Sequence, residues 1–255
     1  MTARVLISND DGVHARGLQA LAEAVAPLAE VWVVAPDKEQ SATSHSLSLH
    51  DPLRIHKHGE RRFSVDGTPA DSVYIALTHL MKDARPTLVL SGINHGPNLA
   101  DDVIYSGTVA AAMEGSILGV PAIAFSLVTR KHFDFTHAAK FAHALVKSAL
   151  ASPLPPRMLL NVNLPAYGEI EGYEVTRLGR HSYGAGVVEK EDPRGRKYYW
   201  IGGTDYAHEK EAGTDVTCVH DLRRASVTPL MLDLTHRELM EPLRQWKVEG
   251  FKLES

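Results

Sequence analysis

The sequence predicts an α/β protein with a mostly parallel sheet flanked by helices, followed by a β-rich C-terminal extension. Short β-branched runs alternate with helical patterns through about the first 150 residues, as in repeated βα units around a parallel sheet. Prolines crowd residues 152–156, where they can neither continue a helix nor join the interior of a sheet. After this break the helical patterns give way to strands.

The elements of the first half follow in order from local patterns. Residues 17–27 carry Leu18, Leu21 and Val25 at helical spacing. Thr68-Pro69 has the N-cap and first-turn residues of a helix that continues to residue 81. The alanine-rich segment 108–118 and the long segment 135–150 also predict helices. The predicted strands are residues 5–7, 31–35, 87–90, 123–126 and 158–162, with 91–94 as the loop that leaves the third of them.

The second half predicts strands at residues 173–178, 197–201 and 226–232 without a helical crossover between them, and a solvated loop at 189–197. We therefore expect an α/β core over 1–165 and an antiparallel extension with a terminal helix over 166–255, which could also pack on the core. A lone hairpin is only marginally stable, and extensions of this kind often reach over a neighbouring subunit, so we expect the chain to assemble.

Composition limits the partners and the compartment. The 255 residues include 31 acidic and 27 basic ones, a formal charge of −4, which argues against a nucleic-acid platform. Cys218 is the single cysteine, so neither an intrachain disulfide nor a cysteine metal cluster can form. No apolar run approaches the roughly 20 residues of a membrane span, and no signal peptide is apparent. We expect a cytoplasmic protein without a membrane partner.

Two adjacent carboxylates, Asp10 and Asp11, follow the first predicted strand, at the edge where such folds bind ligands. With an effective dielectric of about 20, two charges roughly 5 Å apart repel by about 3 kcal/mol, which a shared cation relieves. The pair therefore predicts a metal site. The competing explanation is that one Asp caps the next helix while the other is solvated.

Further oxygen donors follow the neighbouring strands. Asn94 and Asn98 lie in the segment 91–98, and Ser41 lies in a hydroxyl-rich loop after the second strand. Neutral oxygens complement carboxylates around Mg²⁺ or Mn²⁺. Each segment alone is more typical of an ordinary turn or loop than of a metal site.

A third group, Ser106-Gly107-Thr108, precedes an alanine-rich helix. Free N–H groups and the helix dipole make such a terminus a phosphate cradle, although plain capping by either hydroxyl also accounts for it. Together with the strand-end carboxylates and amides, it predicts a phosphoryl-transfer centre. His95 is a candidate general acid that could also point away, and Asp101 and Asp102 are either further site charge or solvated.

With these residues the chain resembles the SurE (survival protein E) family along nearly its whole length. The matching segments are Ser8-Asn9-Asp10-Asp11-Gly12, residues 33–37, 67–71, 91–98, 101–115, 192–195, 213–215 and 226–230. The resemblance implies a Rossmann-like core and a C-terminal extension exchanged between subunits of a homodimer or homotetramer. It also implies a metal-dependent phosphatase that acts on nucleoside 5′-monophosphates, with 3′-nucleotides and short polyphosphate as side activities.

The resemblance also implies roles for individual residues. One divalent ion per subunit (Mg, Mn or Co) would be held by Asp10, Asp11, Ser41 and Asn94. The phosphate site would consist of Asn9, Asn98, Ser106, Gly107 and Thr108, and Asp10, Asp11 and Asn98 would be the catalytic residues.

The chain departs from the family pattern at four places. Arg16 stands where proline is frequent, Ala42 and Ala100 stand where glycine is usual, and Arg223-Arg224-Ala225 replaces a glycine-containing turn. None of these changes removes a proposed ligand. Ala42 restricts the backbone that presents Ser41.

Several mechanisms and functions stay open at this point. The cation would polarise the phosphate and lower the pKa of a bound water that attacks phosphorus, or an aspartate would be the nucleophile through an aspartyl-phosphate. A sensor that binds nucleotide or phosphate without cleaving it is the alternative function. A dinucleotide oxidoreductase lacks support, because the first turn has no Gly-x-Gly-x-x-Gly.

Overall fold

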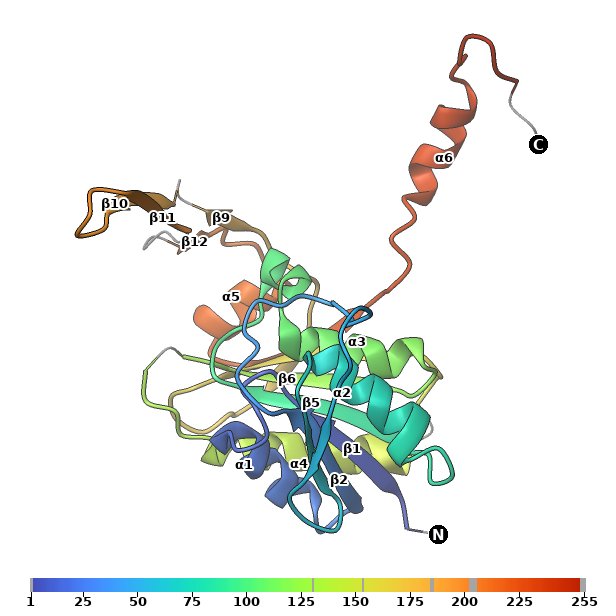
Figure 1. Ribbon diagram of the computed structural model, residues 1–255, viewed down its shortest axis with the longest axis vertical. Helices are drawn as coiled ribbons and strands as arrows, with labels where there is room; N and C mark the ends of the chain where they lie inside the picture. Colours follow the sequence, from blue (N-terminus) through green and yellow to red (C-terminus); the bar gives the residue numbers. More distant parts are fainter. Residues whose placement is uncertain (1, 130, 153, 184–185, 202–205, 253–255) are drawn as a thin grey trace.

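The computed structural model describes residues 2–129, 131–152, 154–183, 186–201 and 206–252, so Pro153 of the proline-rich break lies outside the described residues. Its centre is a nine-stranded sheet in the order β3-β4-β2-β1-β5-β6-β7-β13-β8 (Figure 1). The five central strands β2, β1, β5, β6 and β7 are mutually parallel. The predicted α/β class with a mostly parallel sheet is confirmed.

The strands of this sheet are β1 (Arg4–Ser8), β2 (Glu30–Pro36), β3 (Ile55–Lys57), β4 (Arg62–Val65), β5 (Leu88–Asn94), β6 (Ala122–Val128), β7 (Leu159–Pro165), β8 (Tyr173–Val175) and β13 (Ala225–Leu230). The helical segments are α1 (Arg16–Val25), α2 (Pro69–Ile75), the π-helical η1 (Ala76–Leu80), the 3-10 turn η2 (Ala100–Ile104), α3 (Gly107–Ile117), α4 (Thr136–Ala151), α5 (Asp215–His220) and α6 (Arg237–Arg244).

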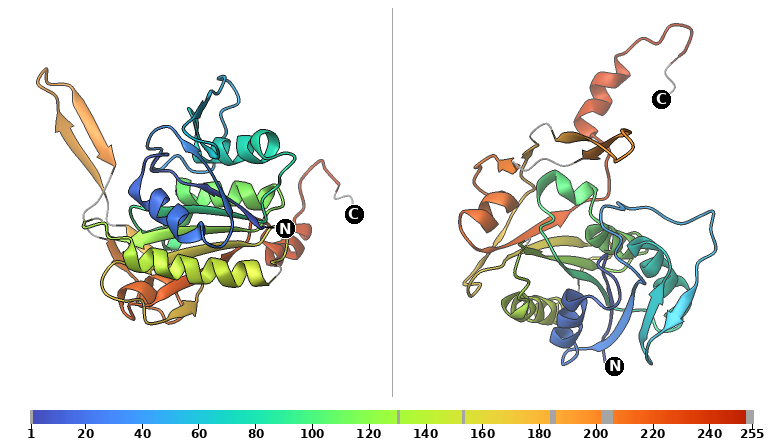
Figure 2. Two further views of the ribbon diagram at one scale, coloured as in Figure 1. Left: turned by 90° about the horizontal axis from the view of Figure 1, so that it is seen from below. Right: turned by 60° about the vertical axis from the view of Figure 1, so that its left-hand side comes forward.

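Alternation along each strand divides the core between the two faces of the sheet. Val5 and Ile7 of β1 join the hydrophobic cluster under α1 and α4, whereas Leu6 joins the cluster under α2 and α3. Helix α3 packs closely on β5, because a Cβ at Gly115 would lie 2.9 Å from side-chain atoms of Val89. Both helical layers are visible in Figure 2.

Helix α2 begins as the sequence predicts. The Thr68 side chain accepts a hydrogen bond from the Asp71 backbone N–H, and the Asp71 carboxylate accepts one from the Thr68 N–H. This reciprocal pair is a capping box, with Pro69 in the first turn.

The second half differs from the predicted antiparallel extension. Strand β13 joins the central sheet antiparallel to β7, and β8 then pairs with β13 in parallel. The boundary expected at residue 165 therefore does not separate the central sheet from the C-terminal part of the chain. Segment 189–197 is only partly a loop, because β10 (Val187–Glu191) and β11 (Lys197–Ile201) form an antiparallel hairpin, with residues 192–196 as its turn. Strands β9 (His181–Tyr183) and β12 (Tyr206–His208) form a second antiparallel pair. In the order of the chain, helix α5 follows β12 and precedes β13.

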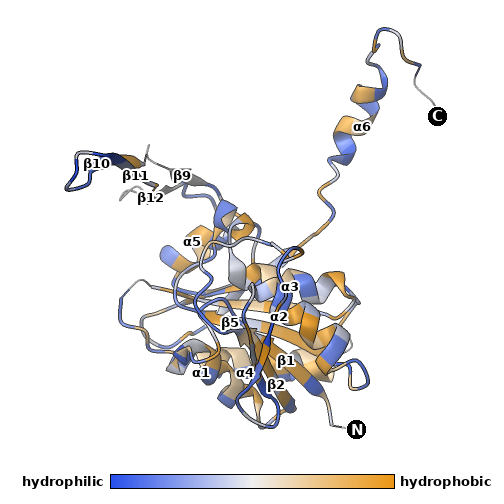
Figure 3. Cartoon of the chain, viewed as in Figure 1, coloured by the Kyte–Doolittle hydropathy of each residue, from blue (hydrophilic) through white to orange (hydrophobic). Residues whose placement is uncertain are grey.

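Two segments project away from the core. The hairpin β10–β11 and the C-terminal helix α6 extend in separate directions (Figures 1 and 2). The predicted terminal helix is present as α6, which combines hydrophobic with hydrophilic residues (Figure 3). Among the described residues, no helix combines the length and apolar character needed to cross a membrane.

The backbone accounts for three of the four departures from the family pattern. Ala42, Ala100 and Arg223 have φ values of 57°, 50° and 55°, in the left-handed region that glycine adopts without strain. The fourth, Arg16, is the first residue of α1, and Ala15 before it is extended with φ −63° and ψ 141°. Proline fits that position of a helix, which explains the usual family residue.

Candidate active site

The carboxylate pair lies at the carboxyl end of β1, and Asp10 is buried. Its side chain belongs to a residue only 5% exposed, and the Thr108 hydroxyl donates a hydrogen bond to its Oδ1. Gly107 lies against the same carboxylate, because a Cβ there would be 2.8 Å from Asp10 Cβ and 3.0 Å from its Oδ2. The alternative in which an aspartate caps α1 is wrong, since α1 has Ala15 at its N-cap without a side-chain bond.

Burial governs the protonation of Asp10. Desolvation raises the pKa of this carboxyl to about 6, an effect that the Thr108 hydrogen bond opposes and the neighbouring Asp11 charge reinforces. A cation at this position would favour the ionised form. The ionised form of Asp10, the more buried carboxylate of the pair, would therefore be stabilised by a bound cation.

Asp11 is held from one side. His95 Nδ1 lies 2.7 Å from Asp11 Oδ2, and the His95 backbone N–H donates to the same oxygen over 3.3 Å. In the described part of the chain, no hydrogen bond to Asp11 Oδ1 is found. One oxygen of the carboxylate is thus committed to the protein while the other is left for a ligand.

The amides come from β5 and the turn after it. Residues 91–94, predicted as a loop, continue β5 up to Asn94, with a register irregularity against β6. Asn94 Nδ2 donates to the Gly96 carbonyl over 3.0 Å, and Asn98 Nδ2 donates to Ser126 Oγ over 2.8 Å. Both amides therefore use their nitrogen within the protein, which leaves the carbonyl oxygen as the group that can accept.

Two amides of β7 fix Asn98, and the sequence reasoning did not include them. The side-chain amides of Asn161 and Asn163 donate to the backbone carbonyl of Asn98 over 2.8 and 2.9 Å. Asn163 Oδ1 in turn accepts a hydrogen bond from the backbone N–H of Asn98 over 2.9 Å. Both are fully buried. Alternating asparagines in an otherwise apolar strand are the signal that could have identified them.

The loop after β2 brings Ser41 to the site. Its hydroxyl donates to Glu39 Oε1 over 2.8 Å and is exposed. The loop is fastened by Ser44, which donates to the Ile104 carbonyl over 2.8 Å, and by His45, whose Nε2 lies 2.7 Å from the buried Glu114 carboxylate.

The amino end of α3 closes the site. Ser106 is the N-cap, and its hydroxyl accepts from the Val109 N–H over 3.0 Å, so capping is confirmed. Thr108 is fully buried with its hydroxyl on Asp10. Asn9 is buried behind the pair: its Nδ2 donates to the Gly12 carbonyl, while its Oδ1 has no hydrogen-bond partner in the described structure.

A cavity of about 860 Å³ collects most of the predicted residues. Its lining includes Asp10, Asp11, Ser41, Asn94, Asn98 and Ser106, together with His14, Arg16, Glu39, His95, Asp102 and Tyr105. Asn9, Gly107, Thr108 and Asp101 are not part of this lining. Asp102 and His95 thus reach the cavity, whereas Asp101 does not.

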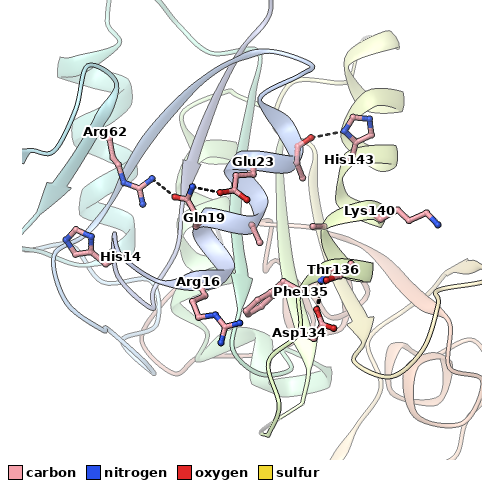
Figure 4. Close-up of a pocket in the computed structure, with 13 residues that line it drawn as sticks. His14, Arg16, Gln19, Glu23, Arg62, Asp134, Phe135, Thr136, Lys140 and His143 are labelled. Carbon is pink, nitrogen blue, oxygen red and sulfur yellow. Dashed lines mark hydrogen bonds between the residues drawn. The ribbon is translucent and has the colours of Figure 1, made fainter.

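A second cavity of about 970 Å³ adjoins the first between α1 and α4, and His14 and Arg16 line both (Figure 4). Arg62 donates to Gln19 Oε1 over 3.1 Å, and Gln19 in turn donates to Glu23 Oε1 over 2.7 Å. His143 Nδ1 lies 2.7 Å from the Ala24 carbonyl. Arg16 also helps to lower the pKa of Asp134, after the hydrogen bonds from Thr136, which are the larger cause.

The donors fit a hard divalent cation. Within the described residues no group of three or more His, Cys, Asp or Glu side chains could hold a metal, so a soft or histidine-rich site is not formed there. Two carboxylates with neutral hydroxyl and amide oxygens are instead the ligands that Mg²⁺ and Mn²⁺ prefer. The charge repulsion between the buried Asp10 and the half-buried Asp11 fits a site made for a cationic ligand.

Fold and site together define a doubly wound α/β protein with an acidic, oxygen-lined cavity at the carboxyl edge of its sheet, beside a helix amino end. Comparison with known proteins identifies the family. The profile described as "Survival protein SurE" matches residues 5–185, and the chain belongs to this family.

Relatives and a solved structure agree with this assignment. The chain is 65% identical over 248 residues to "5′-nucleotidase SurE" of Myxococcus xanthus (strain DK1622), covering 97% of this chain and 95% of that one. It is 51% identical over 251 residues to "5′-nucleotidase SurE" of Vibrio parahaemolyticus, covering 96% and 95%. "Crystal Structure of Sure Protein from Aquifex aeolicus" superposes with a TM-score of 0.84 at 42% identity, covering 94% of this chain and 98% of that one.

Proposed function

We propose that this protein is a metal-dependent 5′-nucleotidase that hydrolyses nucleoside 5′-monophosphates to nucleoside and phosphate. The observation that carries the proposal is the meeting of Asp10, Asp11 and the amino end of α3 in one cavity. The names of the relatives support the same activity. The cavity volume of about 860 Å³ is enough for a whole nucleotide, since small-molecule sites span roughly 300–1,000 Å³.

We assign one divalent ion per subunit to the ligands Asp10, Asp11, Ser41 and Asn94. A bound divalent cation would neutralise phosphate charge and make the phosphorus more electrophilic. Thr108 keeps the Asp10 carboxylate oriented through its hydroxyl, and Gly107 leaves room for that carboxylate. The ion is Mg²⁺, Mn²⁺ or Co²⁺, all of which accept this set of oxygens.

The phosphate would be bound by groups next to the carboxylates. The Ser106 hydroxyl accepts from the Val109 N–H and still has its own proton to donate, and the Gly107 N–H lies in the first turn of α3, where N–H groups have no partner within the helix. Asn98 is held by β6 and β7, so its position is fixed before substrate arrives. Preorganised donors of this kind stabilise charge that develops in the transition state. Asn9 and Thr108 would act behind this layer, because neither lines the cavity.

Two nucleophiles fit the proposal, water and an aspartate carboxylate. Transfer of a phosphoryl group made chiral with oxygen isotopes separates them. Inversion at phosphorus supports direct attack by water, whereas retention contradicts it and supports an aspartyl-phosphate, because that route has two displacements at phosphorus.

The C-terminal half is proposed to build a homodimer or homotetramer. Trp200 and Ile201 of the β10–β11 hairpin are 62% and 93% exposed, and Leu239 and Leu243 of α6 are also exposed. Apolar side chains on projecting segments are typical of surfaces that another chain covers. Light scattering at micromolar concentration tests this, and a monomer would contradict it.

A substrate panel tests the proposed activity. Phosphate release is measured with purine and pyrimidine 5′-monophosphates, 3′-monophosphates and short polyphosphate. We expect the highest kcat/KM with a 5′-monophosphate and lower values with the other two classes. Tight nucleotide binding without release from any compound would contradict the proposal and favour a sensor. A cytoplasmic location remains part of the proposal.

A further inference from the structure

His95 lies in the wall of the catalytic cavity, directly after β5, and has no role in the chemistry proposed above. Its ring nitrogen Nδ1 is 2.7 Å from Asp11 Oδ2, and its backbone N–H reaches the same oxygen over 3.3 Å. An ionised carboxylate can only accept hydrogen bonds, so Nδ1 carries a proton in this contact. Two donors from one residue thus converge on one oxygen of Asp11.

Two aromatic rings fix the orientation of the imidazole. The ring centroids of Phe133 and Phe135 lie 4.9 and 5.1 Å from that of His95, each at an interplanar angle of 85°. The two phenyl rings are nearly parallel, at 12° and 6.4 Å. Edge-to-face contacts of this kind are favourable, and they restrict rotation of the ring between them.

The aromatic pair is itself anchored. Phe135 is 6% exposed and belongs to the hydrophobic core under α1 and α4. A Cβ at Gly17 of α1 would lie 3.1 Å from Phe135 Cε1, so this helix leaves the phenyl ring little space to move. The hydrophobic core therefore determines, through Phe135, which way His95 Nδ1 points.

We propose that His95 is a positioning residue for Asp11, an inference that rests on the proposed metal-dependent function. By holding Oδ2, the imidazole turns the carboxylate so that Oδ1 faces the cation. Protein groups that orient metal ligands in this way typically contribute about 10- to 100-fold to metal affinity. With Nδ1 committed to Asp11, only Nε2 of His95 is left to exchange a proton, so a role as proton donor would involve that nitrogen.

Two substitutions separate the two roles. His95→Asn retains a side-chain N–H near the place of Nδ1 but cannot exchange protons as an imidazole does. His95→Leu removes the donor. Mn²⁺ binding is measured by titration calorimetry on metal-stripped protein. We expect His95→Leu to bind Mn²⁺ about 10- to 100-fold more weakly than the wild type and His95→Asn to recover most of that loss.

His143→Leu is the matched control, because this histidine is also hydrogen-bonded through Nδ1 but lies on α4 in the adjoining cavity. Its Mn²⁺ affinity should equal that of the wild type. Phe133→Leu gives an independent test in case His95→Leu does not fold, since it keeps the donor but loosens its support. It should weaken Mn²⁺ binding several-fold.

Three outcomes overturn the proposal. Wild-type affinity in His95→Leu would show that the contact does not position Asp11. A loss of kcat in both His95 variants at unchanged Mn²⁺ affinity, together with loss of the alkaline limb of the pH–rate profile, would make His95 a proton donor. A wild-type protein that neither binds Mn²⁺ nor releases phosphate would refute the proposed function as well, whereas the first two results leave that function intact.

Discussion

Thr108→Val should make metal binding depend on pH in a defined way. The substitution keeps the shape of the side chain and removes the hydroxyl that donates to Asp10 Oδ1 in a buried site. A hydrogen bond to a charged group contributes about 1.5–3 kcal/mol, and one pKa unit corresponds to about 1.4 kcal/mol. Burial already raises the pKa of Asp10 to about 6. Without the hydroxyl it should rise to about 7–8.

The effect on metal follows from the ionised fraction of Asp10. At pH 7 this fraction should fall from about nine-tenths to between about one-half and one-tenth, so apparent Mn²⁺ affinity should fall about 2- to 10-fold. At pH 9 the carboxyl is ionised in both proteins, and most of the loss should disappear.

Titration calorimetry at pH 7 and pH 9 measures this difference. Thr78→Val is the control, because its hydroxyl donates to the Tyr74 carbonyl on an exposed surface away from the site. An equal loss of affinity at both pH values, or no loss at pH 7, would refute the reasoning that the Thr108 hydroxyl keeps Asp10 ionised.

Three further predictions concern stability and geometry. The folded-state pKa of Asp10 is raised, so without metal its contribution to stability is complete below about pH 4 and is lost as pH rises through about 6. Relative to Asp10→Asn, the wild type should lose up to about 3 kcal/mol of unfolding free energy between those limits, measured by urea denaturation in EDTA. Ala42→Gly should raise the melting temperature, because an exposed alanine with a left-handed backbone conformation costs about 1–2 kcal/mol. Ala100→Gly should change the melting temperature less, because this substitution also removes a buried methyl group. Equal shifts for the two variants would contradict this reasoning. Gly107→Ala should weaken Mn²⁺ binding at least 10-fold, because the added methyl would contact Asp10 at 2.8 Å, and unchanged affinity would refute this account.

The sequence could predict what depends on local pattern or on parallel strand ends. The capping box of Thr68 and Asp71 follows from adjacent residues alone. Asp10, Asn94 and Asn98 could be placed in one cavity because the carboxyl ends of parallel strands meet at one edge of the sheet.

Contacts between distant segments could not be predicted in this way. The pairing of β13 with β7 and β8 depends on nonlocal partners, and the same apolar pattern would also suit a free hairpin. The bond from Thr108 to Asp10 spans 98 residues, and in the sequence Thr108 was indistinguishable from an ordinary cap. The support of Asn98 by Asn163 likewise appears only when β5, β6 and β7 are assembled.

The most direct test of a metal-dependent 5′-nucleotidase is phosphate release from nucleoside 5′-monophosphates by metal-stripped protein, with Mg²⁺, Mn²⁺ or Co²⁺ restored in turn. Asp10→Asn and Asp11→Asn are assayed beside the wild type. We predict that release is absent without metal, returns with at least one of these ions, and is lost in both variants. Release that persists without metal, or in both variants, would contradict the assignment of the carboxylate pair as the catalytic metal site.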